Sequence, residues 1–170
     1  MVEPWLRGTL TDVNAVQRAV LHALELARED IEKWIGGLSD AELEEEPLKL
    51  PSVGRQMRHI VRSLDRLLTY AEERPLSAEQ MEALKSEPEA SASRQRLLAE
   101  LQDGIASAME RIRAFRPESY REPRGVGRKM LPTTVAGLLV HCADHTQRHT
   151  GQLVTTVKVL TELRDRVKTL

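Results

Sequence analysis

Residues 131–160 read LPTTVAGLLVHCADHTQRHTGQLVTTVKVL, and the spacing of polar and apolar residues in this stretch predicts a long helix. Three of the five histidines of the chain lie here, His141, His145 and His149, four residues apart. Because an α-helix turns by about 100° per residue, a step of four rotates a side chain by only about 40° and raises it by about 6 Å. The three imidazole rings are therefore predicted to stack along one face of the helix.

The face that carries these histidines is also the apolar face of the predicted helix. Its residues recur at steps of three or four, which is the spacing of a stripe that faces a protein core. Imidazole rings on such a stripe are expected to point inward. The stripe consists of Val135, Leu138, Cys142, His145, His149, Leu153, Thr156 and Leu160.

Two inward imidazoles at positions i and i+4 can share one metal ion. His141 and His149 lie about 12 Å apart along the helix axis, so one ion with metal–nitrogen bonds of about 2.1 Å cannot bind all three rings. The spacing leaves two pairs open, His145 with His149 or His141 with His145. It also leaves open that these histidines are core residues hydrogen-bonded to neighbours. A zinc-protease motif is disfavoured, because HTQRH lacks the glutamate of HExxH.

The composition is typical of one soluble domain, which we expect to span residues 1–170. The formal net charge is −1 and aromatic residues make up 3%, so no nucleic-acid partner is expected. The single cysteine, Cys142, excludes an intramolecular disulfide and fits a reducing compartment. No apolar run approaches the about 20 residues of a membrane span, and the first residues lack a signal-peptide core. A cytoplasmic protein without a membrane partner is therefore expected.

Four long amphipathic helices are predicted, and no segment is convincing as a strand. The expected fold class is therefore an all-α helical bundle. We expect the helices to run from Thr11 or Asp12 to Gly36-Gly37, from Leu50-Pro51-Ser52 to about Glu73, from about Ser91 to Arg116, and from Leu131 to about Val167.

The connections between these helices carry their own signals. Ser39-Asp40 can cap a short acidic turn through Glu46. Within the connector 74–92, Ser77-x-x-Gln80 is typical of a capping box for a short helix, which Pro88 would close. The long loop 117–131 contains basic residues that can meet an anionic ligand, although a solvated charged loop is the simpler interpretation.

The other two histidines have no metal-spaced partner on their own helices. His22 is interpreted as structural or exposed. His59 lies about 130° from the centre of the apolar face of its helix, so periodicity favours a surface histidine. A bundle helix that touches two neighbours can, however, bury a second and more polar face. That face would consist of Ser52, His59, Ser63 and Tyr70.

Three motifs together resemble the DinB-like superfamily, also called the DinB/YfiT-like metalloenzymes. They are SVGRQMRHI at residues 52–60, the HxxxHxxxH pattern at 141–149, and Gly151-Gln152 directly after it. The similarity extends over almost the whole chain. Its most specific part is the text HTQRHTGQ at residues 145–152.

The resemblance implies a four-helix bundle with up-down-down-up topology and a three-histidine site for a divalent metal, zinc or nickel. Carried over residue by residue, the metal ligands are His59, His145 and His149, with His141 outside the ligand set. The resemblance also implies a homodimer. Helix surfaces such as those carrying Leu84 or Leu98 can supply the contact.

The implied function is that of a metal-dependent enzyme acting on a small molecule. Three imidazoles and one open position are the ligand arrangement of catalytic zinc sites. Such an ion can activate water, or a low-molecular-weight thiol cosubstrate, so the expected activity is that of a hydrolase or a thiol S-transferase. The alternative is a non-enzymatic helical bundle that binds or senses metal.

No catalytic residue is assigned beyond the metal ligands. Asp65, Asp144 and Gln152 can orient a ligand or line the pocket, or they can be ordinary polar residues. Cys142 is expected to be a small buried hydrophobe. We expect the segment 46–52 to lie beside the site, and the loop 117–131 to lie away from it.

Overall fold

The computed structural model of the protein describes residues 2–86 and 92–168, which form a mostly helical fold with one small sheet. This confirms the expected helical class. The long helices are α1 (Ala15–Ile35), α3 (Val53–Ala71), α5 (Arg94–Ala114) and α6 (Val135–Lys168). The shorter elements are α2 (Asp40–Glu44), α4 (Ala78–Ser86), β1 (Pro123–Val126), β2 (Leu131–Thr134) and the 3-10 turns Pro4–Leu6, Pro47–Lys49 and Pro117–Arg121.

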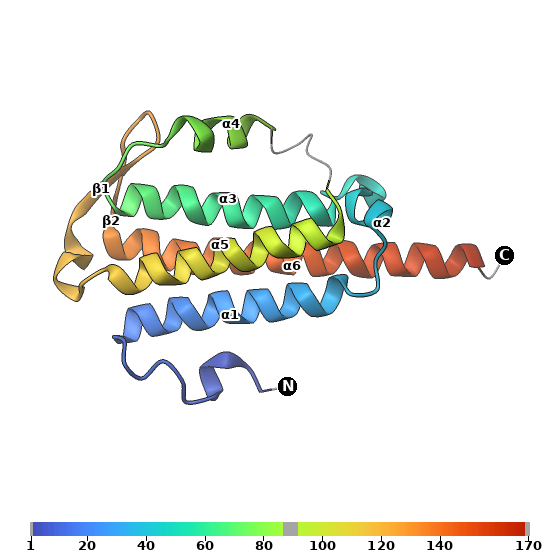
Figure 1. The fold of residues 1–170 in the computed structure, drawn as a ribbon, viewed down its shortest axis with the longest axis horizontal. Coiled ribbons are helices and arrows are strands. Elements are labelled where there is room, and N and C mark those ends of the chain that lie inside the picture. The colour runs from blue at the N-terminus through green and yellow to red at the C-terminus, as the bar shows by residue number, and fades with distance from the viewer. Residues whose placement is uncertain (1, 87–91, 169–170) are drawn as a thin grey trace.

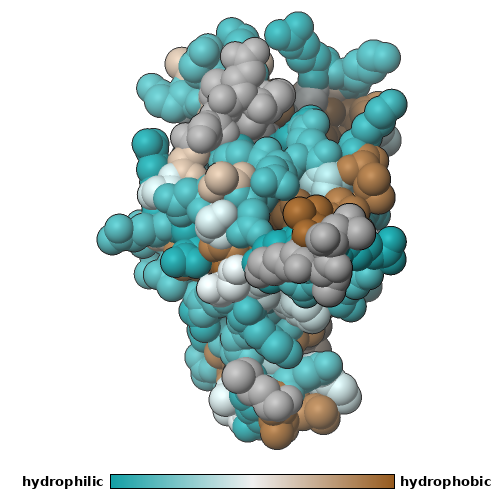
Figure 2. All heavy atoms as spheres, turned by 90° about the vertical axis from the view of Figure 1, so that its right-hand side faces the viewer, coloured by the Kyte–Doolittle hydropathy of each residue, from teal (hydrophilic) through white to brown (hydrophobic). Residues whose placement is uncertain are grey.

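The four long helices lie side by side (Figure 1). In Figure 1, α1 and α6 run in one direction, while α3 and α5 run in the other. Both α1 and α3 contact α5 as well as α6. Helix α6 extends past its neighbours toward the C-terminus. The end of the molecule that carries α2 has a mainly hydrophilic surface with small hydrophobic areas (Figure 2). Among the described residues, no helix is both long enough and apolar enough to cross a membrane.

The core is built from the inward stripes of the long helices. Burial of such apolar side chains contributes about 25 cal/mol per Å² removed from water, which makes this core the main source of stability. The predicted stripe of α6 is buried except at its two half-buried histidines. The largest fully buried side chains are Leu21, Leu24, Ile31, Ile35, Leu43, Met57, Ile60, Leu64, Leu68, Leu97, Leu101 and Ile105.

The predicted start of the first helix, with a cap at Thr11 or Asp12, is wrong by two or three residues. Thr11 and Asp12 lie in a turn, and the cap of α1 is Asn14. Its Oδ1 accepts hydrogen bonds from the backbone N–H groups of Val16 and Gln17, both at 3.1 Å. Asparagine caps helices as well as aspartate does, so the sequence offers competing caps within a few residues.

The other helix starts follow their capping residues. Ser39 and Glu42 form a capping box on α2, and Ser52 caps α3. The predicted capping box of Ser77 with Gln80 is confirmed, since each side chain bonds the backbone N–H of the other. Helix α5 begins at Arg94, directly after its cap Ser93. The predicted boundary residues Pro88 and Ser91 lie outside the described residues.

The expectation of no strand is wrong between residues 123 and 134. Strands β1 and β2 pair antiparallel, with Gly125 opposite Pro132. Gly127 adopts a φ of +69° in the connecting turn, a conformation that favours glycine. Each strand has only four residues and contains a proline, so no alternating pattern could be recognised. Consequently α6 begins at Val135 rather than Leu131, and Thr134 Oγ1 accepts from the N–H of Gly137 at 3.1 Å.

A buried ion pair between Glu44 of α2 and Arg58 of α3 links these two helices. Both guanidinium Nη atoms of Arg58 donate to the carboxylate of Glu44, at 2.8 and 3.0 Å, and the Arg58 side chain is only 2% exposed. Glu44 Oε2 also accepts from the Ser52 hydroxyl at 3.5 Å. A Cβ at Gly54 would lie 2.6 Å from Glu44 Oε1, so glycine leaves room for the carboxylate. The pair holds the segment that leads into α3.

We predict that Glu44→Ala destabilises the protein by about 2–3 kcal/mol, because it leaves the Arg58 guanidinium buried without its carboxylate. Urea unfolding followed by circular dichroism measures this. The matched control is Glu82→Ala in the exposed pair with Lys85, which should cost less than about 1 kcal/mol. Equal losses in the two variants would contradict the structural role of the Glu44–Arg58 pair.

Candidate metal centre

Three histidines from two helices converge at the contact between α3 and α6. One ring nitrogen from each of His59, His145 and His149 lies within 4.8 Å of the other two. The Nε2 atoms of His59 and His145 are 3.0 Å apart. The His59 ring centroid is 4.4 Å from that of His149, and the centroids of His145 and His149 are 4.5 Å apart. The three residues named by the sequence analysis are thus neighbours in space.

Helix geometry explains this convergence. His145 and His149 are one turn apart on the stripe of α6 that faces α3. His59 lies on the second face of α3, where Ser52 and Ser63 are also buried and Tyr70 is half-buried. Because α3 packs against both α5 and α6, it buries two faces. The periodicity argument that made His59 a surface residue was therefore wrong.

The electrostatic surroundings keep His145 neutral. Burial, with the neighbouring imidazoles and Arg148 adding to it, lowers the pKa of His145 to about 4. A neutral imidazole has a free lone pair, which is the form that binds a metal ion. His145 is therefore available as a ligand at neutral pH.

His141 lies outside the group of three. It is exposed, its ring centroid is 5.3 Å from that of His145, and its Nδ1 lies 3.6 Å from a carboxylate oxygen of Asp144. Asp144 also accepts from Arg148 at 3.0 Å. The Asp144 carboxylate thus forms these contacts along the solvent face of α6, which corresponds to the surface-charge interpretation.

Ser63 and Arg66 support His59 from the next turn of α3. The Ser63 hydroxyl lies 3.3 Å from His59 Nε2 and accepts a hydrogen bond from Arg66 Nη2 at 3.1 Å. Because that bond occupies an oxygen lone pair, the hydroxyl hydrogen is directed elsewhere. Ser63 can therefore donate to His59 Nε2, the nitrogen that also faces His145.

A cavity of about 160 Å³ opens beside the histidines. Its lining includes Pro51, which confirms the prediction that the segment 46–52 lies beside the site. It also includes Gln152, which favours the pocket-lining alternative for that residue. The remaining lining residues are Arg55, Gln56, His59 and His149. The loop 117–131 instead lines a separate cavity with Tyr70, as expected for a segment away from the site.

Arg55 and Gln56 were not identified from the sequence. They precede His59 by four and three residues, so helical spacing alone places them on its side of α3. Gln56 is buried and donates to Pro51 O and to Thr156 Oγ1, both at 3.2 Å. The i−4 and i−3 positions of a ligand histidine are thus the signal that could have found them.

The remaining candidate residues have structural roles. Asp65 pairs with Arg111 at 2.7 Å and accepts from Gln80, so it is a surface charge. Cys142 is fully buried, and burial raises its thiol pKa to about 12, so it is a core residue. His22 is buried 3.2 Å from the Thr9 hydroxyl, which is a structural role.

The chemistry of the three histidines fits a divalent metal ion. A tetrahedral ion with metal–nitrogen bonds of about 2.1 Å needs nitrogens about 3.4 Å apart. One nitrogen from each ring lies within 4.8 Å of the other two, and those of His59 and His145 are 3.0 Å apart, so small side-chain movements reach this spacing. The donors are imidazoles only, a set that suits zinc, nickel and copper better than magnesium or calcium. Arg55 in the adjacent cavity supplies positive charge next to the histidines. The three residues can hold one ion and leave a side open toward the cavity.

Comparisons with known proteins agree with this arrangement. A family model described as the DinB superfamily matches residues 23–153. A crystal structure of a conserved protein from Enterococcus faecalis has a similar fold, with a TM-score of 0.72 and 20% sequence identity. The similarity covers 88% of this chain and 99% of that protein. No curated protein sequence matches this chain.

We predict that the protein binds one divalent ion per chain, measured by titrating metal-free protein with zinc and nickel. His59→Ala, His145→Ala and His149→Ala should each weaken binding by at least about 100-fold, since even residues that only orient a ligand contribute 10–100-fold. His141→Ala is the matched control and should bind within about tenfold of the unmodified protein. If His141→Ala abolishes metal binding while His149→Ala does not, the ligands on α6 are His141 and His145 instead, one helical turn earlier.

Proposed function

Because this chain belongs to the DinB superfamily, we propose that it is a metal-dependent enzyme that acts on a small molecule, as a hydrolase or a thiol S-transferase. The single observation that supports this most is the group of His59, His145 and His149, which opens onto a cavity. The metal site that the family resemblance implies and the three-histidine group of this chain both fit a metal-dependent enzyme.

The three histidines would hold a divalent ion, zinc or nickel. When bound, such an ion supplies Lewis acidity, which lowers the pKa of a water or a thiol that it holds. The chain's own contribution is to present neutral imidazoles on two rigid helices. Burial keeps the His145 ring neutral.

The cavity residues would bind and position the substrate. Arg55 offers a guanidinium that forms a long ion pair, 3.8 Å to Glu46. Gln152 adds an exposed amide on the opposite helix. Both side chains can bind polar groups of a small molecule next to the ion. With a volume of about 160 Å³, the cavity suits a small reacting group more than a whole large ligand.

The competing proposal is a non-enzymatic bundle that binds or senses metal. Two features favour it. Among residues 2–86 and 92–168, no carboxylate lines the cavity beside the histidines, so this part of the chain offers no obvious general base there. The 3.0 Å contact between His59 and His145 also shows that the rings can satisfy one another by a hydrogen bond. The two proposals differ in whether the bound ion turns over a substrate.

The same family membership supports finer proposals on architecture. We propose that α1, α3, α5 and α6 form an up-down-down-up four-helix bundle within a single domain of residues 1–170. A homodimer, through surfaces such as that of Leu84 or Leu98, and a cytoplasmic location also remain proposals. Size-exclusion chromatography with light scattering tests the dimer directly.

We predict that zinc- or nickel-loaded protein turns over a chromogenic ester, or joins 2-mercaptoethanol to an electrophile such as 1-chloro-2,4-dinitrobenzene. Absorbance assays measure both reactions. Because the ion is required, activity should vanish on chelation, return on adding metal, and be absent in His149→Ala but present in His141→Ala.

Turnover that survives both chelation and His149→Ala would rule out a metal-based mechanism. Normal metal binding without turnover of either substrate class would favour the metal-binding or sensing alternative.

A further inference from the structure

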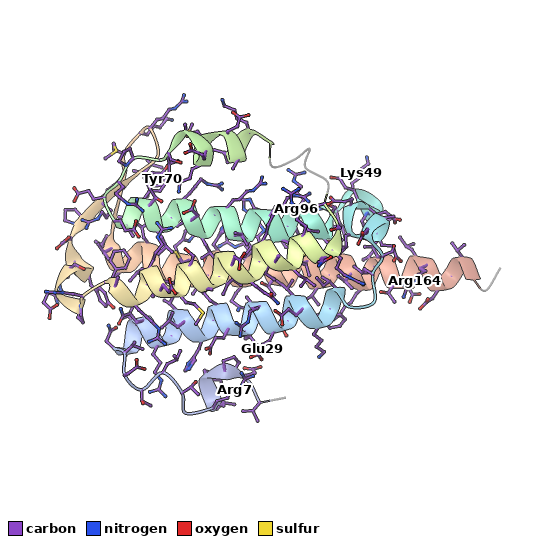
Figure 3. All side chains as sticks on the ribbon, in the orientation of Figure 1. Arg7, Glu29, Lys49, Tyr70, Arg96 and Arg164 are labelled. Atoms are coloured by element: carbon purple, nitrogen blue, oxygen red, sulfur yellow. The ribbon has the colours of Figure 1, made fainter. Side chains whose placement is uncertain are left out.

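A cavity of about 660 Å³ lies where the β1–β2 hairpin meets α4 and the end of α3. This volume is in the range of small-molecule sites. Figure 3 labels Tyr70, which lines the cavity, at this end of α3. Tyr70 follows His59 by eleven residues, or about 16 Å along the helix axis, so the cavity is separate from the metal centre.

The walls of the cavity are mainly apolar and come from three segments far apart in sequence. Tyr70 closes one side, Leu76 and Met81 come from the connector and α4, and Met130 and Pro132 come from the hairpin. Such a lining favours a ligand with an apolar body.

The β1–β2 hairpin places Met130 in the wall of the cavity. Met130 has a φ of +48°, an uncommon conformation for a residue other than glycine. Its side chain lies over Gly125, where an added Cβ would collide with it. The glycine therefore allows Met130 to lie over the strand and form part of the wall.

Two hydrogen-bond donors at the cavity have no partner among residues 2–86 and 92–168. They are the Tyr70 hydroxyl and the Arg128 guanidinium. The other arginines of the lining are already engaged. Arg124 donates to Ala71 O and to Glu122, both at 2.8 Å, and Arg74 pairs with Glu72. The donors left for a ligand are thus one cation and one hydroxyl.

The lining also carries one carboxylate, which does not cancel this preference. The side chain of Glu73 is 78% exposed, and its nearest cation is Arg124 at 3.9 Å. Of the three arginines in the lining, Arg74 and Arg124 pair with Glu72 and Glu122, which lie outside it, so their charges are largely balanced. Arg128 has no ion pair among the described residues and can attract an anion, which the solvent-exposed Glu73 carboxylate repels only weakly.

We infer that this cavity binds a small amphipathic organic acid, with its apolar body against Leu76, Met81 and Met130 and its acidic group on Arg128 and Tyr70. A carboxylate or sulfonate accepts hydrogen bonds from a guanidinium and a hydroxyl, and charge strengthens these bonds. The binding does not require the metal centre, so the site stands independently of the proposed enzymatic activity.

The test uses two fluorescent probes that differ only in an acidic group. The anion is 8-anilino-1-naphthalenesulfonate, and its neutral counterpart is N-phenyl-1-naphthylamine. Fluorescence titration of the folded, full-length protein should give saturable binding of both at one site. Arg128→Gln should lower the affinity for the anionic probe by at least about tenfold, which corresponds to the loss of one charge-assisted hydrogen bond. It should leave the affinity for the neutral probe unchanged.

Four further variants locate the site. Tyr70→Phe should lower the affinity for the anionic probe only, and by a smaller factor than Arg128→Gln. Met81→Trp should fill the cavity and lower the affinity for both probes. Lys129→Gln removes the same charge at an exposed neighbour that does not line the cavity, so it should change neither affinity. His149→Ala, at the metal centre, should also change neither.

Three results would overturn the inference. They are no saturable binding of the anion by the unmodified protein, equal losses in Arg128→Gln and Lys129→Gln, and unchanged affinities in Met81→Trp with a native circular dichroism spectrum. The first needs no substitution, and the second uses only the exposed positions Arg128 and Lys129, whose substitution leaves the fold intact.

Discussion

The candidate site depends on the register of α3 against α6, which a buried polar contact fixes. The amide of Gln56 donates to Thr156 Oγ1 and to Pro51 O, and Gln56 and Thr156 are almost fully buried. A buried polar group costs free energy when it loses its partner, so sliding one helix along the other is unfavourable. His59 follows Gln56 by three residues and His149 precedes Thr156 by seven. The register that gives the Gln56 amide NH2 its two acceptors therefore also brings these two imidazoles together.

The same contact links the two helices to the segment that leads into α3. Pro51 accepts hydrogen bonds in this network and lines the cavity beside the histidines. From the other side, the Glu44–Arg58 pair anchors that segment to α2. Helix packing thus positions the ligands, and these polar contacts position one wall of the cavity. The metal centre is built on rigid elements rather than on loops, as an ion with fixed ligand geometry requires.

The sequence predicts the half of the site that lies on one helix. Spacing alone narrows the ligands on α6 to His145 with His149 or His141 with His145, because a helix places residues four apart on one face, and the resemblance selects the first pair. His59 does not follow from spacing, because periodicity measures a single apolar face and α3 buries two. Only the resemblance of the surrounding motif identified it. The β hairpin and the start of α6 were missed because four-residue strands containing proline have no alternation to detect. The Glu44–Arg58 pair joins residues fourteen apart on different helices, and local sequence patterns do not predict such contacts.

The central claim is that one divalent ion is held by three imidazoles from α3 and α6. X-ray absorption spectroscopy of the zinc-loaded protein tests it most directly, because it counts the ligands and identifies their atoms. The account predicts three imidazole rings with nitrogen at about 2.0–2.1 Å and no sulfur, since Cys142 is buried in the core. A sulfur ligand at about 2.3 Å, or fewer than three imidazoles, would contradict it.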